Sequence, residues 1–302
     1  MTARTQREIK RPKNPRKSAR AQAGNAAARR SIVDLSEYSK TSGRAILLHG
    51  HTDAGKTVCA IHKAPRPLLV LDCDTGLESI FGTTRPSDVH VWAPREEGTD
   101  LDWEQMDEFR DYVKSGDWIL PYKTIVVDNV TAGQKPVIVH SLQEAISKLP
   151  EEKRANRDPD IPSQQDWGKI YRIYDRWIRD IRNAKRRGVN VVFTCGTREW
   201  LDEVEGYAKL MPNLEGAIRN QIATHMDVVG YMESDEDGRR LILGPSGATI
   251  TKVRLPVQRH NQRPDMIESP DFPKMIKAVE VINADDTARP KKKTTTKRRT
   301  KK

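Results

Sequence analysis

Eight consecutive residues carry the clearest chemistry in this sequence. They fit the phosphate-loop pattern G-x-x-x-x-G-K-[ST] without departure, and they are Gly50, His51, Thr52, Asp53, Ala54, Gly55, Lys56 and Thr57. The two glycines let the backbone curl so that successive N–H groups point at a phosphate chain, and the helix beginning near Lys56 adds its positive dipole end. Lys56 can reach the β- and γ-phosphates, while Thr57 can offer its hydroxyl to Mg²⁺. The stretch therefore predicts a nucleoside triphosphate site.

A carboxylate at the tip of an apolar strand is the expected partner of Thr57 at the cation. Asp128 ends the run Ile125–Val127, so a rigid strand would deliver its carboxylate to Mg²⁺. Asp72 competes for this role, because Leu68–Leu71 also ends in an acid. We prefer Asp128, since a polar helix start follows it directly.

Four further residues have a catalytic and a structural interpretation. Asp74 could polarise the attacking water or cap the next helix. Thr194 could sense the γ-phosphate or only fill a strand. Lys252 and Arg254 could reach the nucleotide of a neighbouring subunit as cationic fingers, or stay solvated on an edge strand.

The elements that must position these residues alternate along the chain. Apolar runs predict buried strands at 44–49, 66–74, 123–128 and 190–194, with a weaker one at 89–92. Apolar residues at helical spacing predict helices at 102–113, around 137–146, from Ser163 to Gly188 and at 272–282. A hairpin is expected at 227–243, extended by 249–255, and long polar loops at 149–165 and 196–216. The order predicts an α/β fold: a mainly parallel sheet between helices, with antiparallel edge strands late in the chain.

Charge is distributed unevenly over the 302 residues. Residues 1–30 and 289–302 each carry a net charge of +9, whereas the whole chain carries +11, which leaves −7 for residues 31–288. Such ends bury too little apolar surface to offset chain entropy, so we expect a disordered basic arm at 1–41 and a disordered basic tail at 283–302. They flank one predicted domain at 42–282. Basic arms favour a nucleic acid partner over a solubilising role.

Several classes are disfavoured by composition. The three cysteines, Cys59, Cys73 and Cys195, form no C-x-x-C pair, so neither a disulfide framework nor a zinc site is indicated. The N-terminus lacks the apolar core of a signal peptide, and the longest apolar runs are too short to span a membrane. The cytoplasm is the expected compartment.

An ordered set of motifs resembles a known family. After the phosphate loop come Leu71-Asp72-Cys73-Asp74-Thr75-Gly76-Leu77, Val127-Asp128-Asn129, Gln165-Asp166-Trp167-Gly168, Val191-Val192-Phe193-Thr194, Pro212-Asn213-Leu214-Glu215-Gly216, Asp227-Val228-Val229-Gly230-Tyr231 and Lys252-Val253-Arg254. This order resembles the bacteriophage RecA-like ATPases, which include single-strand annealing and recombination proteins, and covers roughly residues 42–282. The resemblance implies that Asp74 stands where the family has a catalytic glutamate, and that loops 149–165 and 196–216 stand where single-stranded DNA is held.

Together these features predict an ATP- and Mg²⁺-dependent RecA-like ATPase acting on single-stranded DNA in phage recombination or replication, in the host cytoplasm. A homo-oligomeric ring or filament is expected, because such sites are normally completed by the next subunit, and a single-strand binding protein is a possible partner. Two alternatives stay open. One is a small-molecule kinase of the same loop class; the other is a non-catalytic DNA-binding assembly protein that uses nucleotide as a switch.

Overall fold

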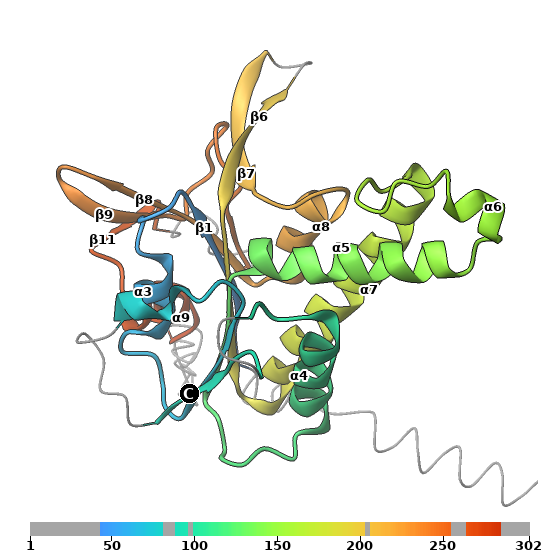
Figure 1. Cartoon of the computed structure of the whole chain (residues 1–302). Coiled ribbons are helices and arrows are strands. Elements are labelled where there is room, and N and C mark those ends of the chain that lie inside the picture. Colours follow the sequence, from blue (N-terminus) through green and yellow to red (C-terminus); the bar gives the residue numbers. More distant parts are fainter. Residues whose placement is uncertain (1–42, 81–87, 96–98, 203–205, 255–263, 285–302) are drawn as a thin grey trace, which may run out of the picture. The chain divides into compact units, whose positions relative to one another are not determined.

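The computed structural model of the chain describes residues 43–80, 88–95, 99–202, 206–254 and 264–284. The predicted basic arm at 1–41 lies outside these ranges, as do residues 285–302 of the tail predicted at 283–302, whereas residues 283 and 284 belong to the last helix. Figure 1 shows the arrangement of the described elements. Among the helices in these ranges, none combines the length and the apolar character that crossing a bilayer requires.

Strands and helices alternate through most of the described chain. The first half contains β1 (Ala45–Gly50), α3 (Lys56–Ile61), β2 (Leu68–Asp72), the 3-10 helix η1 (Gly76–Ile80), β3 (Val89–Trp92), α4 (Trp103–Ser115), β4 (Thr124–Asp128) and α5 (Val130–Ser147). The second half contains α6 (Glu151–Arg154), α7 (Gln164–Arg182), the 3-10 helix η2 (Asn183–Arg187), β5 (Asn190–Cys195), β6 (Thr197–Asp202), β7 (Tyr207–Pro212), α8 (Ile218–His225), β8 (Val228–Asp235), β9 (Gly238–Ile242), β10 (Lys252–Val253), β11 (Met266–Glu268) and α9 (Phe272–Ala284).

The central sheet has the strand order β11-β9-β8-β1-β5-β4-β2-β3, and β10 also pairs with β8. The pairs from β8 through β1, β5, β4 and β2 to β3 are parallel, whereas β9, β10 and β11 join antiparallel at the other edge. This confirms the predicted fold class. Because the parallel strands point the same way, the residues after β1, β2, β4 and β5 meet at one edge of the sheet.

Two apolar layers cover the two faces of the sheet. Along β1 every side chain is buried, and alternate residues join different clusters: Ala45 and Leu47 pack with α4, α5 and α7, whereas Ile46 and Leu48 pack with α3 and α9. Figure 1 shows these two groups of helices on opposite sides of the sheet. Burial on both faces explains why the parallel strands read as continuous apolar runs.

Helix α7 fixes the region around the tip of β4. Its start has the predicted capping box, in which Ser163 and Asp166 exchange hydrogen bonds. The hydroxyl of Tyr174 donates to the carbonyl of Val130 over 2.5 Å, and the indole of Trp177 donates to the carbonyl of Met106 over 2.9 Å. Both rings are fully buried. The helix therefore holds the residues that directly follow Asp128.

The two segments expected as long loops contain regular structure. Residues 149–165 include the short helix α6. The segment 196–216 contains an antiparallel hairpin, in which β6 pairs with β7 from Thr197 opposite Pro212 to Asp202 opposite Tyr207. The hairpin projects from the central sheet in Figure 1. Its sequence reads as a loop because much of it is solvent exposed, so no apolar face marks it as a strand.

Candidate functional site

The phosphate loop joins the end of β1 to the start of α3. Gly55 has φ 82°, in the left-handed region that favours glycine, and Asp53 has φ 62°. The Lys56 ammonium folds back and donates to the carbonyl of His51 over 2.6 Å. Burial lowers the pKa of Lys56, against the opposing attraction of Asp128. A cation held partly out of water beside backbone amides provides a positive site for a phosphate chain.

Asp128 lies directly against the loop. One carboxylate oxygen, Oδ1, accepts a hydrogen bond from the Thr194 hydroxyl, and the Thr57 side chain lies near enough to oppose the rise in the pKa of the carboxyl group. The other oxygen, Oδ2, is buried and has no hydrogen-bond partner within the described residues. Burial raises the pKa of Asp128 to about 6. A nearly inaccessible carboxylate with an unsatisfied oxygen is suited to contact a bound cation.

These residues fit a magnesium ion. Mg²⁺ prefers hard oxygen ligands and is commonly held by one or two protein oxygens together with substrate phosphates and water. The Thr57 hydroxyl and the unpartnered Oδ2 of Asp128 supply that kind of donor beside the phosphate loop. Groups of three or more His, Cys, Asp or Glu suited to a metal are absent from the described residues. The donor set therefore suits a cation shared with a nucleotide.

The two other strand-tip acids occupy different positions. Asp74 is exposed and accepts a hydrogen bond from the Asn129 amide, whose own oxygen caps α5 by accepting from the Ala132 N–H. Asp72 instead accepts from the N–H of Gly76 over 3.3 Å, and burial raises its pKa. The structure thus brings Asp128, not Asp72, to Thr57, and it leaves Asp74 free to face a ligand.

A cavity of about 770 Å³ opens above the loop, a size within the usual range for ligand sites. All the loop residues except Ala54 line it, together with Asp74, Asp128, Asn129, Thr131, Lys135, Gly196, Thr197, Asn213 and Arg239. We call this the nucleotide cavity. Lys135 and Arg239 were not anticipated from the sequence. A Cβ atom built on Gly55 would lie 2.8 Å from Cδ and Nε of Arg239, so this arginine lies against the loop.

Two predicted site residues lie elsewhere than expected. Thr194 stands behind Asp128, with its hydroxyl committed to that carboxylate, and is not in the wall of the nucleotide cavity. Arg254 lies at the opposite edge of the sheet, where it pairs with Asp227, whose carboxylate accepts from the N–H of Ala45 at the start of β1. The cause is the antiparallel pairing of β10, which places Val253 opposite Val228 at the beginning of β8.

His49, another residue missed in the sequence, ties the loop to the hairpin. It is fully buried at the end of β1, and its Nε2 lies 2.8 Å from the carbonyl of Ile250, so Nε2 carries the proton and donates. Its Nδ1 therefore accepts from the Thr197 hydroxyl over 2.9 Å. Burial lowers the pKa of His49 to about 4, so the ring is neutral. The first residue of β6 is thereby joined to the strand that carries the phosphate loop.

Beyond this root, the hairpin carries an aromatic side chain between two cations. Trp200 is 45% exposed, and the guanidinium carbons of Arg219 and Arg198 lie 3.8 and 5.6 Å from its ring centroid. Arg198 also pairs with Glu215 over 2.8 Å. An exposed indole flanked by guanidinium groups is a surface on which an aromatic base can stack.

A second cavity, of about 700 Å³, shares Asp74, Ala132 and Lys135 with the nucleotide cavity. Its remaining wall comes mainly from the start of α4 and from α5, and includes Trp103 and His140, whose rings stack 5.5 Å apart. Asp74 therefore lies between two cavities.

A phosphate loop at the carboxyl edge of a mainly parallel sheet, with a buried strand-tip aspartate against its threonine, defines a P-loop nucleoside triphosphatase fold. Comparison with protein families agrees: a family described as an AAA domain (AAA_24) matches residues 42–255, and the chain belongs to this family. Nucleotide binding and ATPase activity are what this class indicates.

No curated protein matches the chain. Among solved structures, the chain is similar to a KaiC-like protein from the hyperthermophilic archaeon Pyrococcus horikoshii, with 14% identity, a TM-score of 0.37, and coverage of 70% of this chain and 84% of that one.

Proposed function

We propose that this protein is an ATP-hydrolysing, Mg²⁺-dependent RecA-like motor that acts on single-stranded DNA, in phage recombination or replication. The observation that carries the enzymatic part is the meeting of Asp128 and Thr57 beside the phosphate loop, with one carboxylate oxygen unsatisfied. The DNA and phage parts rest on the resemblance of the ordered motifs and on the charge of the chain ends.

The residues in and behind the wall of the nucleotide cavity have distinct roles in this proposal. The loop amides and Lys56 hold the β- and γ-phosphates, and Thr57 with Asp128 would hold Mg²⁺. The bound cation supplies charge neutralisation at the phosphate oxygens. Thr194 positions Asp128 through its hydroxyl. Asp74, oriented by Asn129, accepts the proton of the water that attacks the γ-phosphate.

Coupling to DNA is proposed to pass through the β6–β7 hairpin. Gly196 and Thr197 belong both to the root of the hairpin and to the wall of the nucleotide cavity. The N–H of Gly196 donates to the Thr131 hydroxyl over 2.9 Å, and Thr197 bonds His49. A change of ligand at the phosphates would therefore alter the contacts at the base of the β6–β7 hairpin, which exposes Trp200.

We also propose, on the basis of the same family resemblance, that the protein forms a homo-oligomer. The predicted role of Arg254 at a neighbouring nucleotide remains a prediction too. In the isolated chain its guanidinium lies 3.2 Å from Asp227, and this ion pair would have to be shared or broken for such a role.

The deciding measurement is the rate of phosphate release from ATP, with and without single-stranded DNA. We expect DNA to stimulate the wild-type rate, and Lys56→Ala to abolish turnover while circular dichroism shows a retained fold. Unchanged hydrolysis in Lys56→Ala would remove the enzymatic assignment. Tight ATP binding with negligible turnover in wild type would favour the nucleotide-switched assembly protein.

A second candidate function is phosphoryl transfer to a small acceptor, and the cavity beside Asp74 favours it specifically. An acceptor hydroxyl bound there would lie on the other side of the same carboxylate that is proposed to activate water. The same assay separates the two functions. Under the motor proposal, ATP consumption responds to DNA; under the kinase proposal, it responds to a hydroxylated small molecule that is recovered with a phosphoryl group.

A further inference from the structure

A second charged concave site lies at the amino-terminal ends of the parallel strands, whereas the nucleotide cavity lies at their carboxyl-terminal ends. It is a cavity of about 500 Å³, lined by Lys114, Arg176, Arg179, Asp180, Arg182, Asn183 and Arg186. We call it the basic cavity. The end of α7 and the start of η2 form most of it, and Lys114 comes from the last turn of α4. Because β5 begins just after η2, this site lies at the amino edge of the parallel strands.

Cations outnumber carboxylates in the wall of the basic cavity. Five lining residues are Lys or Arg, and only Asp180 is acidic. Asp180 lies 3.7 Å from Lys114, and Arg179 pairs over 2.8 Å with Asp175, a residue outside the cavity. The positive charges of Arg176, Arg182 and Arg186 therefore exceed what the local carboxylates neutralise.

Arg182 lies where this excess is most unfavourable. Burial lowers the pKa of its guanidinium, and the nearby charges of Arg186, Arg179 and Arg254 lower it further, against the attraction of Asp227. Its Nε and the Oδ1 of Asn183 are buried without hydrogen-bond partners within the described residues. The Nε–H of Arg182 is a buried donor surrounded by like charges, so an anion would both accept its hydrogen bond and offset those charges.

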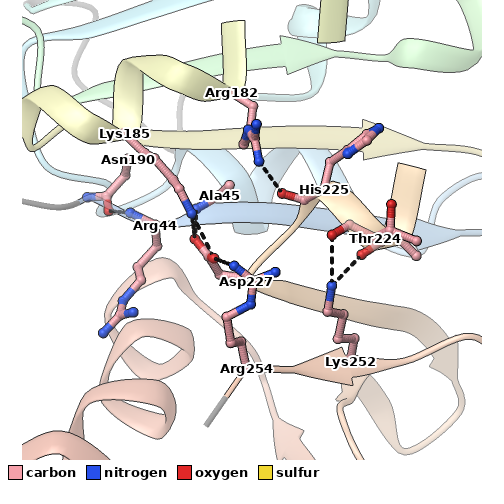
Figure 2. Close-up of polar contacts among 11 residues, drawn as sticks. Arg44, Ala45, Arg182, Lys185, Asn190, Thr224, His225, Asp227, Lys252 and Arg254 are labelled. Atoms are coloured by element: carbon pink, nitrogen blue, oxygen red, sulfur yellow. Dashed lines mark hydrogen bonds and ion pairs between the residues drawn. The ribbon is translucent and has the colours of Figure 1, made fainter. Parts of the chain in front are cut away.

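The neighbouring cluster around Asp227, drawn in Figure 2, is a group of cations whose charge is neutralised by a carboxylate. There Lys185 and Arg254 converge on the carboxylate of Asp227, and Lys252 donates to the carbonyls of Ala223 and Thr224. Within the part of the chain that the structure describes, the Arg182 guanidinium donates to the carbonyl of His225 over 3.4 Å. The Asp227 cluster is an internally neutralised structural site, whereas among the described residues the basic cavity beside it has Asp180 as its one acid against five cations.

We propose that the basic cavity binds the phosphodiester backbone of single-stranded DNA, the polymer on which the proposed motor acts. This inference rests on the proposed function and deepens it, since it assigns a second contact for DNA on the face away from the nucleotide. Guanidinium groups offer paired donors that match phosphate oxygens.

The composition of the wall selects this ligand. All seven lining side chains are charged or amide groups, so neither a lipid chain nor the apolar part of a peptide finds a partner there. None of the described residues that line the cavity is aromatic, which favours contact with the backbone over contact with bases. The chain ends, each with a net charge of +9, would attract the same polyanion.

The test compares two charge-reversal variants of the full chain. Arg176→Glu with Arg186→Glu changes two exposed residues of the basic cavity, and Lys274→Glu with Lys277→Glu makes the same change of charge at exposed positions on α9. Binding of a fluorescein-labelled oligothymidylate is followed by fluorescence anisotropy over a series of NaCl concentrations. We expect the cavity variant to bind about tenfold more weakly than the control variant, with a salt dependence shallower by about 1.4 in log–log slope.

The remaining arms make each outcome decisive. Arg176→Lys with Arg186→Lys keeps the charge and should restore most of the salt slope, and thermal melting verifies that all variants fold. Equal affinity and slope in the cavity and control variants would overturn this inference while leaving the proposed function intact, whereas failure of wild type to bind DNA or respond to it would remove that function itself. Weaker binding of labelled polyglutamate to the cavity variant than to the control variant, with equal affinity of the two for the oligothymidylate, would assign the cavity to an acidic protein instead.

Discussion

Two buried aspartates lie at opposite ends of the parallel strands of one sheet: Asp128 at the carboxyl end of β4, and Asp227 just before the start of β8. Their surroundings differ. Asp227 is 4% exposed, and its carboxylate accepts the N–H of Ala45 and pairs with Lys185 and Arg254. Asp128 is 3% exposed; its Oδ1 accepts from the Thr194 hydroxyl, the Thr57 side chain lies nearby, and Oδ2 has no partner among the described residues. The two carboxylates are alike in burial and unlike in counterion.

The pKa values follow from that difference. Burial opposes ionisation at Asp227, but Lys185, the Ala45 amide and Arg254 outweigh it and lower the pKa. At Asp128 burial prevails over the two hydroxyl hydrogen bonds and raises the pKa to about 6. A fully neutralised buried acid is structural, whereas one without a cation is poised to receive one.

The strongest test of the contrast between Asp128 and Asp227 is to remove the charge at Asp128. Asp128→Asn keeps the shape of the side chain but removes the carboxylate proposed to hold Mg²⁺. We expect ATP turnover to fall about a thousandfold, which corresponds to about 4 kcal/mol of transition-state stabilisation. Steady-state phosphate release measures it. Turnover within a few-fold of wild type would mean that Asp128 is a structural acid like Asp227.

The reciprocal change at the other edge should act on folding. Asp227→Ala leaves Lys185, which is largely buried, without its partner and removes the acceptor for the Ala45 amide. We expect the free energy of unfolding to drop by about 3 kcal/mol. Urea titration measures this, and turnover per folded molecule should stay near wild type because Asp227 lies away from the nucleotide cavity. A large loss of turnover with unchanged stability would contradict the structural assignment.

Stability against pH sharpens the contrast further. The folded-state pKa of Asp128 lies above its ordinary value of 3.8, so the folded protein binds an extra proton between roughly pH 4 and 6, and the stability from that proton is lost as pH rises through 6. Without nucleotide and in chelator, Asp128→Asn should therefore be more stable than wild type at pH 8 by on the order of 2 kcal/mol, and the gain should shrink toward pH 4. Thermal melts at both pH values measure the difference.

The pKa shift of Asp227 has the opposite sign to that of Asp128, and Asp227 serves as the internal control. Its lowered pKa stabilises the fold above pH 3.8 and loses that contribution only in more acidic solution. Because it is present in both wild type and Asp128→Asn, it cancels in their difference. Melting curves that differ by the same amount at pH 8 and pH 4 would show that the Asp128 carboxylate is not unfavourably buried.

Local patterns predicted much of this arrangement. The phosphate loop, the apolar strands that end at Asp72 and Asp128, and the capping box of α7 are each encoded within a few residues, so they could be found without knowing the fold. The preference for Asp128 over Asp72 as the partner of Thr57 stays a prediction; of the two acids, it is Asp128 that lines the nucleotide cavity.

Properties set by strand order could not be found that way. Thr194 reaches Asp128 because β5 lies beside β4, and Arg239 reaches the loop because the β8–β9 hairpin continues the sheet beside β1. Arg254 falls at the opposite edge because β10 runs antiparallel to β8. In each case the sequence specifies the strand but not its neighbour or its direction, and these decide what a side chain meets.

The smallest expected effect concerns Arg239, and the chain offers a matched control in the next residue. Successive side chains on a strand point to opposite sides. Arg239 lies against Gly55, whereas Arg240 pairs with Glu233 over 2.9 Å and with Asp235. In Arg239→Ala we expect the dissociation constant for ATP to rise about tenfold, the cost of one charge-assisted contact of about 1.4 kcal/mol, while Arg240→Ala should match wild type.

Titration with ATP and with ADP locates the contact that Arg239 makes. A guanidinium that reaches the terminal phosphate should weaken ATP binding in Arg239→Ala more than ADP binding, and one that reaches the inner phosphates should weaken both equally. Equal affinities in the two arginine variants would place Arg239 outside the nucleotide contacts. The nucleotide cavity would then draw its positive charge from Lys56, Lys135 and the loop amides, and the contrast between the two edges would rest on Asp128 and Asp227 alone.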